Sequence, residues 1–478
     1  MYLNPIISGF YPDPSVCRVG DDYYLVTSSF EYYPAIPIFH STDLVNWTRI
    51  GACVTNPEYL PFEKFTPSGG VWAPTIRYAY GRFYVACAIS GFGNMIVSAQ
   101  TPLGPWSRPV WVNMGGIDPT LLFDGDDVYF ATNDNLGTGR EAISAAKVNQ
   151  DTGELLTEPT VIWNGTGGGW LEAPHLYHIG GWYYLLCAEG GTGLGHMATL
   201  ARCETPLGVY KTCPNNPVLT NRNETTKRVA CAGHADIVDD TQGRLWLVHL
   251  ATRPCINQKS SIGRETFLTP VELKQDGLYV PGGRAKIIND IETAHQSLKE
   301  KINYNFASES WEPEWMFLGN RANIKRQNAL IMRDMAFAAL RQTEYISSLQ
   351  ADISLLSAES EAGIKIYLQP DFYAAAMLTN VNGEQRLKAV YRFDDISQTV
   401  YDENADNIVA LKAESNRDKY ILWAIDKELK KTKLLSISAR FFATDTANRC
   451  FTGTLFALYS LQGKASFKNV VYISRREV

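Results

Sequence analysis

Three carboxylates stand at related places in the sequence and could act together on one substrate. Asp13 and Asp118 each directly precede a proline, and Glu172 lies two residues before one. Hydrolysis of a glycosidic bond uses one carboxylate as a base that activates water and a second, protonated one that gives a proton to the leaving oxygen. A third carboxylate can keep the pKa of that acid high. These residue types therefore predict a glycoside-hydrolysing site.

The segments around the carboxylates belong to a sequence repeat. Each copy has a residue followed by proline, a few further residues, a glycine and an aromatic strand. The copies begin at Asp13-Pro14, Ala73-Pro74, Asp118-Pro119, Ala173-Pro174 and, more loosely, His234-Ala235. Their spacing of roughly 45 to 60 residues is typical of propeller blades with about four strands each. Five copies predict an all-β fold that begins with a five-bladed β-propeller, a catalytic domain over residues 1–290.

The phase of the repeat predicts that the carboxylates converge. The innermost strands of all blades surround one channel, so equivalent residues meet at one face. Asp13 and Asp118 share their phase with His234, whereas Glu172 stands one position earlier, in the phase of Trp72. A single Asp before proline would be interpreted as a backbone cap in a turn. Because blade two has alanine at that phase, the site hypothesis is favoured over the cap, and crowding should raise the pKa of at least one acid.

The rest of the chain lacks this repeat. Apolar and polar residues alternate in segments such as 364–368 and 470–473, which predicts a β-sandwich over residues 303–478. The charged stretch 291–302 is expected to be a helical or irregular connector. One helix is predicted to interrupt the sandwich, over Ile324–Leu340.

Composition and charge exclude several other classes of protein. A hydrophobic content of 45% with 20% charged residues is typical of a soluble globular protein, and no apolar run is long enough to span a bilayer. The net charge of −6 argues against nucleic acid or an anionic membrane as a partner. Nine cysteines without a Cys-x-x-Cys pair, and an N-terminus without a signal pattern, predict a reduced, cytoplasmic enzyme. Formation of a homo-oligomer is left open.

A cofactor is not expected from the sequence. The glycine-rich stretch Gly190–Gly195 lies within a blade with no helix after it, so it is interpreted as a loop and not as a phosphate-binding motif.

At these residues the chain resembles glycoside hydrolase family 43, the five-bladed β-xylosidases and α-L-arabinofuranosidases. The segments that carry the resemblance are Asn4–Ser15, Gly116–Pro119, Trp170–His175, Ser29–Glu31, Gly70–Pro74, Gly233–Asp236, Gly263–Thr266, Glu314–Leu318 and Phe451–Gly453. The resemblance implies that Asp13 is the general base, that Asp118 orients the acid and tunes its pKa, and that Glu172 is the general acid. It also implies inversion of the anomeric configuration.

The same resemblance implies a set of substrate-binding residues: Phe30, Trp72, His234, Arg264 and, on a loop of a concanavalin-like sandwich, Phe451. It leaves open a calcium ion or a water molecule at the propeller centre near His234. Each residue also has a plain structural interpretation. Phe30 and Trp72 could pack an inner strand, His234 could be a hydrogen-bonded core histidine, and Arg264 could pair with any surface carboxylate.

These observations predict an exo-acting, inverting glycoside hydrolase that releases a terminal non-reducing pentose from xylo- or arabino-oligosaccharides. The sugar would be β-1,4-linked D-xylose, α-L-arabinofuranose or both. One alternative is an endo-arabinanase, which needs an open groove. Another is a non-catalytic carbohydrate-binding propeller, which would be expected to lack one of the three acids. A retaining enzyme acting on sucrose or fructans would carry Asn-Asp-Pro where this chain has Tyr11-Pro12-Asp13-Pro14.

Overall fold

The computed structural model describes residues 2–224, 228–254, 259–289, 299–319, 321–405, 407–447 and 450–477. The chain packs as two compact units, Met1–Arg253 with Glu265–Gln296, and Pro254–Arg264 with Ser297–Val478. Packing thus assigns 254–264, and strand β24 (Lys299–Tyr304), to the second unit. The domain boundaries at 290 and 303 stay predictions.

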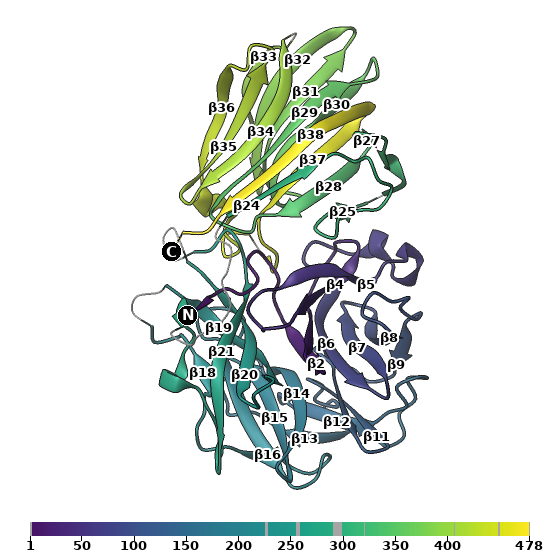
Figure 1. The fold of residues 1–478 in the computed structure, drawn as a ribbon, viewed down its shortest axis with the longest axis vertical. Helices are drawn as coiled ribbons and strands as arrows, with labels where there is room; N and C mark the ends of the chain where they lie inside the picture. Colours follow the sequence, from purple (N-terminus) through teal and green to yellow (C-terminus); the bar gives the residue numbers. More distant parts are fainter. Residues whose placement is uncertain are drawn as a thin grey trace. The chain divides into compact units, whose positions relative to one another are not determined.

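The first unit is a five-bladed β-propeller, as predicted, and its blades follow one another along the chain from β2 to β22 (Figure 1). Blades one and two comprise β2 (Ser15–Val19), β3 (Asp22–Val26), β4 (Ala35–Ser41) and β5 (Thr48–Val54), then β6 (Val71–Ala79), β7 (Arg82–Ile89), β8 (Gly93–Ala99) and β9 (Val110–Val112). Blade three comprises β10 (Thr120–Asp124), β11 (Asp127–Thr132), β12 (Ile143–Lys147) and β13 (Thr160–Trp163). Blade four comprises β14 (Glu172–Ile179), β15 (Trp182–Glu189), β16 (Met197–Cys203), β17 (Lys211–Thr212) and β18 (Leu219–Thr220), and blade five β19 (Ala230–Asp239), β20 (Leu245–Thr252), β21 (Glu265–Lys274) and β22 (Gly277–Tyr279).

The start of each inner strand has one unusual backbone conformation. The residue that opens every repeat has a positive φ: Asp13 56°, Ala73 33°, Asp118 54°, Ala173 52° and His234 48°. Residues other than glycine seldom adopt this left-handed conformation. In blades two, four and five the pairing with the second strand also shifts register here, as in a β-bulge. A bulge redirects side chains, so the repeat builds five equivalent corners at one end of the channel.

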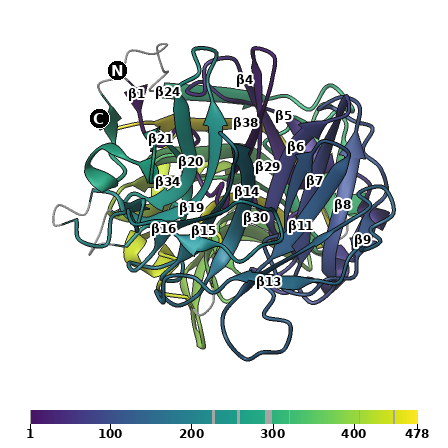
Figure 2. The ribbon, with the colours of Figure 1, turned by 90° about the horizontal axis from the view of Figure 1, so that it is seen from below.

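The N-terminal segment closes the propeller ring against blade five. Strand β1 (Tyr2–Leu3) pairs with β23 (Ile288–Asn289), and the Asn4 side chain exchanges hydrogen bonds with the backbone of Leu268 in β21. The Tyr2 hydroxyl also donates to the Leu268 carbonyl, 2.8 Å away. Apolar side chains of this segment and of blades one and five form one buried cluster. Figure 2 shows the order of strands within a blade, with β6, β7, β8 and β9 following one another outward.

The second unit is a β-sandwich of two antiparallel sheets, as predicted. One sheet comprises β24, β26 (Ile324–Arg326), β27 (Leu330–Arg333), β29 (Ile346–Leu355), β34 (Ile408–Asn416), β35 (Lys419–Asp426), β36 (Lys431–Ser438) and β38 (Lys464–Arg475). The other comprises β25 (Met316–Leu318), β28 (Ala336–Arg341), β30 (Ser360–Gln369), β31 (Phe372–Val381), β32 (Glu384–Phe393), β33 (Ile396–Asn404) and β37 (Leu455–Gln462). The described helices are single 3₁₀ turns: η1 (Pro57–Tyr59), η2 (Phe62–Lys64), η3 (Pro281–Gly283), η4 (Arg321–Asn323) and η5 (Ala439–Phe442).

The helix predicted over Ile324–Leu340 is wrong, because this stretch forms strands β26, β27 and most of β28. Its Ala, Leu and Met residues are good helix formers, but pairing of β27 with β38 and of β28 with β37 outweighs that local preference. Asn328 and Met335 have positive φ. The turn at Asn328 joins β26 and β27 as a hairpin, and the turn at Met335 sends the chain from β27 in one sheet to β28 in the other. Of the predicted connector, residues 291–298 lie outside the described chain, and the part from Lys299 is strand β24. Among the described residues, no helix has the length and apolar character needed to cross a bilayer.

Candidate active site

Asp13 is buried at the start of blade one and is held by two neighbouring blades. Its Oδ2 accepts a hydrogen bond from the Ser28 hydroxyl at 2.5 Å, and the Ser28 oxygen accepts from the Ala73 backbone N–H of blade two at 2.7 Å. On the other side, Nδ1 of His234 from blade five lies 3.5 Å from Oδ1 of Asp13. The predicted base and the predicted channel histidine are therefore brought together.

Asp118 and Glu172 are linked through one backbone group. Oδ2 of Asp118, in blade three, accepts a hydrogen bond from the Ala173 N–H of blade four at 3.1 Å. Ala173 directly follows Glu172, so Asp118 fixes the backbone that carries the predicted acid. Glu172 is partly exposed and opens β14 just before the register shift, in the place that Trp72 holds in β6. The offset inferred from the repeat thus corresponds to a real difference in position on the strand.

The buried thiol of Cys87 is influenced by the charges of two of the acids, Asp13 and Asp118. Burial raises the pKa of Cys87, in β7, and the negative charges of Asp118 and Asp13 raise it further. Its Sγ contacts the Trp72 carbonyl oxygen at 3.1 Å. Asp13 and Asp118, from blades one and three, therefore both act on a side chain of blade two.

The two predicted aromatic residues of the sugar subsite occupy different environments. Trp72 is half-buried, and its indole N–H donates to the Ser68 carbonyl at 2.9 Å. Ser68 is held in turn by Glu31, whose buried carboxylate accepts from the Ser68 N–H at 3.0 Å. Burial raises the pKa of Glu31 to about 8. Phe30 is 2% exposed and forms a backbone bridge with Val71, so it supports the wall behind Trp72.

The loop that leads to Glu172 is fastened to a buried carboxylate. Glu189, in β15, is 1% exposed and accepts hydrogen bonds from the Thr166 N–H at 2.9 Å, the Gly168 N–H at 2.7 Å and the Thr199 hydroxyl at 2.8 Å. Gly168 approaches so closely that a Cβ there would lie 2.9 Å from Glu189 Oε2. The loop therefore has one fixed path towards the acid.

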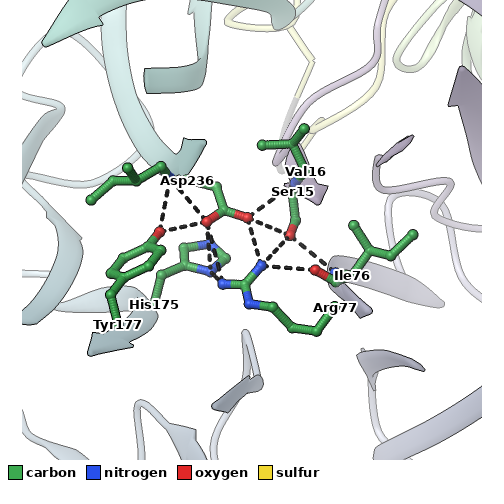
Figure 3. Close-up of polar contacts among 8 residues, drawn as sticks. Ser15, Val16, Ile76, Arg77, His175, Tyr177 and Asp236 are labelled. Carbon is green, nitrogen blue, oxygen red and sulfur yellow. Dashed lines mark hydrogen bonds and ion pairs between the residues drawn. The ribbon is translucent and has the colours of Figure 1, made fainter. Parts of the chain in front are cut away.

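Four blades meet in a buried ion pair on the channel axis (Figure 3). Nη1 of Arg77, from β6, lies 2.9 Å from Oδ2 of Asp236, from β19. Asp236 also accepts from the Ser15 hydroxyl at 2.6 Å, the Val16 N–H at 3.0 Å and the Tyr177 hydroxyl. The guanidinium therefore neutralises a carboxylate that is completely buried.

Arg77 acts on the protonation of Asp236 and on the tautomer of His175. Asp236 is desolvated, yet Arg77 and the surrounding donors hold the pKa of this carboxyl well below its usual range. Nη2 of Arg77 lies 3.1 Å from Nδ1 of His175. Because a guanidinium only donates, this nitrogen accepts, and the proton of the neutral imidazole resides on Nε2. Burial lowers the pKa of His175 to about 4, so the ring is neutral near pH 7.

Sequence reasoning missed this network. Neither Arg77 nor His175 is among the site residues predicted from the sequence, although Arg77 stands four residues after Ala73, which opens its repeat. A signal was present two residues after the opening of each repeat, where all five copies carry a buried polar side chain: Ser15, Thr75, Thr120, His175 and Asp236. A polar position repeated on inner strands indicates a channel lining.

Arg264 and Phe451 lie together in the second unit. The Arg264 guanidinium carbon is 5.8 Å from the centroid of the Phe451 ring, and Nη2 contacts the Phe451 carbonyl at 3.3 Å. The substrate-binding roles predicted for both residues stay predictions.

The donor set at the propeller centre does not fit a bound calcium ion. Calcium takes six to eight oxygen ligands. Asp236, the carboxylate on which four blades converge, is already paired with a guanidinium. Among the residues that the structure describes, no group of three or more His, Cys, Asp or Glu is arranged to hold a metal ion.

Comparison with known proteins agrees with this architecture. The family model described as glycosyl hydrolases family 43 matches residues 2–279, and the one described as the beta xylosidase C-terminal concanavalin A-like domain matches residues 291–473. The non-reducing end alpha-L-arabinofuranosidase BoGH43B of Bacteroides ovatus is 32% identical, with 96% of this chain and 91% of that protein covered. A xylosidase/arabinosidase of Butyrivibrio fibrisolvens is 41% identical over 60% of this chain and 58% of that protein.

A solved structure extends the likeness to both units. The crystal structure of a xylan beta-1,4-xylosidase from Bacillus halodurans superposes with a TM-score of 0.90, at 26% identity, covering 99% of this chain and 100% of that one. Because a family model spans more than half of the sequence, the assignment does not depend on any single relative. The chain belongs to glycosyl hydrolases family 43 and is a glycoside hydrolase.

Proposed function

We propose that this chain is an exo-acting, inverting glycoside hydrolase that removes a terminal non-reducing pentose, D-xylose or L-arabinofuranose, from short oligosaccharides. The observation that carries the proposal is the arrangement of three acids at the starts of inner strands in a family 43 propeller. The relatives named as a non-reducing end alpha-L-arabinofuranosidase and a xylosidase/arabinosidase support the choice of sugar.

In the proposed reaction Asp13 is the base. A water molecule gives a proton to Asp13 while its oxygen attacks the anomeric carbon from the face opposite the leaving group. Ser28 and His234 hold Asp13 from two sides, so its position is set before substrate binds. Glu172 gives its proton to the glycosidic oxygen as that bond breaks. Asp118 holds the backbone beside Glu172 and so orients the acid.

The test of these roles replaces the proposed acid by Glu172→Gln. Loss of general acid catalysis should lower kcat on xylobiose by about 10²–10⁴-fold. The loss should be smaller on nitrophenyl pentosides, because nitrophenolate departs without full protonation. Unchanged hydrolysis of both substrates would remove Glu172 from the mechanism.

Stereochemistry and sugar preference need separate measurements. Proton NMR of the first product should show the inverted anomer, α-xylose from a β-xyloside. A first product that retains the β configuration would remove Asp13 as a base acting through water. Rates on nitrophenyl β-D-xyloside and α-L-arabinofuranoside, measured side by side, decide which pentose is preferred. The cytoplasmic location stays a prediction, which fractionation of the producing cells would test.

A further inference from the structure

One largely exposed aromatic side chain, Trp170, stands beside the proposed acid in the sequence. Trp170 is 71% exposed, although tryptophan is usually largely buried, and it lies two residues before Glu172. Its φ of 55° is a conformation that residues other than glycine seldom adopt. A single exposed apolar residue is ordinary on a protein surface. An exposed one held in a strained conformation by several contacts requires an explanation.

Two neighbouring segments, the β11–β12 and β15–β16 connections, fix the position of Trp170. Its backbone N–H donates to Oε1 of Glu141, from the connection between β11 and β12, at 2.7 Å. Its ring lies against Gly191, where an added Cβ would be 3.3 Å from Cδ1 of the indole. The Gly190 N–H donates to the Gly169 carbonyl at 2.7 Å, which ties the two loops together. The indole of Trp170 therefore packs against the glycine-rich stretch at Gly191.

Strand topology places this residue at the carboxylate end of the propeller. Glu172 opens β14 and pairs with Ala188 near the end of β15. The connections β13–β14, which carries Trp170, and β15–β16, which carries Gly191, therefore leave the blade at the end where Glu172 lies. Leu194, also exposed, stands in that second connection.

The chemistry of the acid decides which part of the substrate lies here. A general acid protonates the leaving oxygen, so the departing sugar lies on the side of Glu172. The flat face of an indole packs well against the C–H face of a pyranose ring through dispersion and burial of apolar area. We propose that Trp170 is a stacking platform for the sugar on the leaving-group side of the scissile bond. The inference rests on the proposed function and narrows the substrate to those with a sugar ring as leaving group.

The experiment compares two substrates that differ only in the leaving group. The leaving group of xylobiose is a xylose ring. The leaving group of β-D-xylosyl fluoride is a fluoride ion, which cannot stack on an indole. Trp170→Ala should lower kcat/KM on xylobiose about tenfold, a loss typical of one stacked ring, and leave kcat/KM on the fluoride within about twofold. Trp170→Phe, which keeps a ring, should recover most of the xylobiose rate.

A matched control is available on the opposite end of the propeller. Leu103 is also 71% exposed, but it lies in the connection between β8 and β9, away from the carboxylates. Leu103→Ala should change neither substrate, and thermal melting of each variant checks the fold. Equal effects of Trp170→Ala on the two substrates, or none on either, would overturn the inference while leaving the proposed function in place. A wild-type protein inactive on every pentoside would remove the proposed function first, and this inference with it.

Discussion

Removal of the charge of Arg77 should destabilise the propeller. Methionine at position 77 keeps much of the length of the side chain but leaves Asp236, which is 0% exposed, without its cation. Breaking a buried ion pair by removing one partner costs about 3–5 kcal/mol. The Arg77 side chain is itself only 15% exposed, so solvent screening reduces this value little. For a domain of this size the loss corresponds to a fall in melting temperature on the order of 10 °C.

The assay is thermal unfolding followed by circular dichroism, with Arg77→Met compared with the double variant Arg77→Met, Asp236→Asn. The asparagine removes the orphaned charge and keeps an oxygen that can accept from Ser15 and Val16. The double variant should therefore recover at least half of the lost stability. Arg77→Lys is a weaker control, since an ammonium restores the charge without the paired contacts.

The pH dependence provides an independent check with a definite sign. In the wild type the pKa of Asp236 is depressed, so its stabilising contribution is present at neutral pH and is lost as pH falls below the ordinary Asp value. Without Arg77, desolvation would raise that pKa, and the variant would gain stability as pH falls. The difference in melting temperature between wild type and Arg77→Met should therefore become smaller as the pH is lowered. A variant that melts within about 2 °C of wild type at pH 7, or a difference independent of pH, would refute the reasoning.

Two further predictions concern buried histidines and the acid's loop. Burial lowers the pKa of His175 and of His249 to about 4, below the ordinary value, so the unfolded chain binds protons that the folded chain does not. Stability should therefore fall between about pH 6.5 and pH 4, by up to about 3 kcal/mol for each histidine, and His175→Asn should flatten part of the decline in a series of melting curves. Glu189→Gln exchanges an acceptor oxygen for an amide donor beneath the Thr166–Gly168 turn, so kcat on xylobiose should fall about tenfold. The buried donors left unpaired, at about 1–3 kcal/mol, should also lower the melting temperature. A kcat of Glu189→Gln equal to that of wild type would show that the anchored loop does not position Glu172. Glu204→Gln, a substitution in an exposed turn elsewhere, serves as the control.

The five blades and the phase of the site could be predicted from the amino-acid sequence. Repeats of glycine, proline and aromatic strands are local signals, and each copy encodes the same turns and strands without knowledge of the others. The opening residue of all five repeats has the same left-handed conformation, so the phase recognised from the sequence corresponds to one backbone position in each blade. The one-residue offset of Glu172 was visible for the same reason, because a repeat preserves position along its strand.

The contacts between inner strands of different blades could not be predicted from the sequence. Arg77, His175 and Asp236 are distant in sequence, and each is an ordinary polar residue within its own blade. Only closure of the ring brings them together, and desolvation then makes their charges interact strongly. The stretch Ile324–Leu340 was predicted wrongly for a related reason. Its helical preference is local, whereas the strands that overrule it, β37 and β38, lie more than a hundred residues away in the chain.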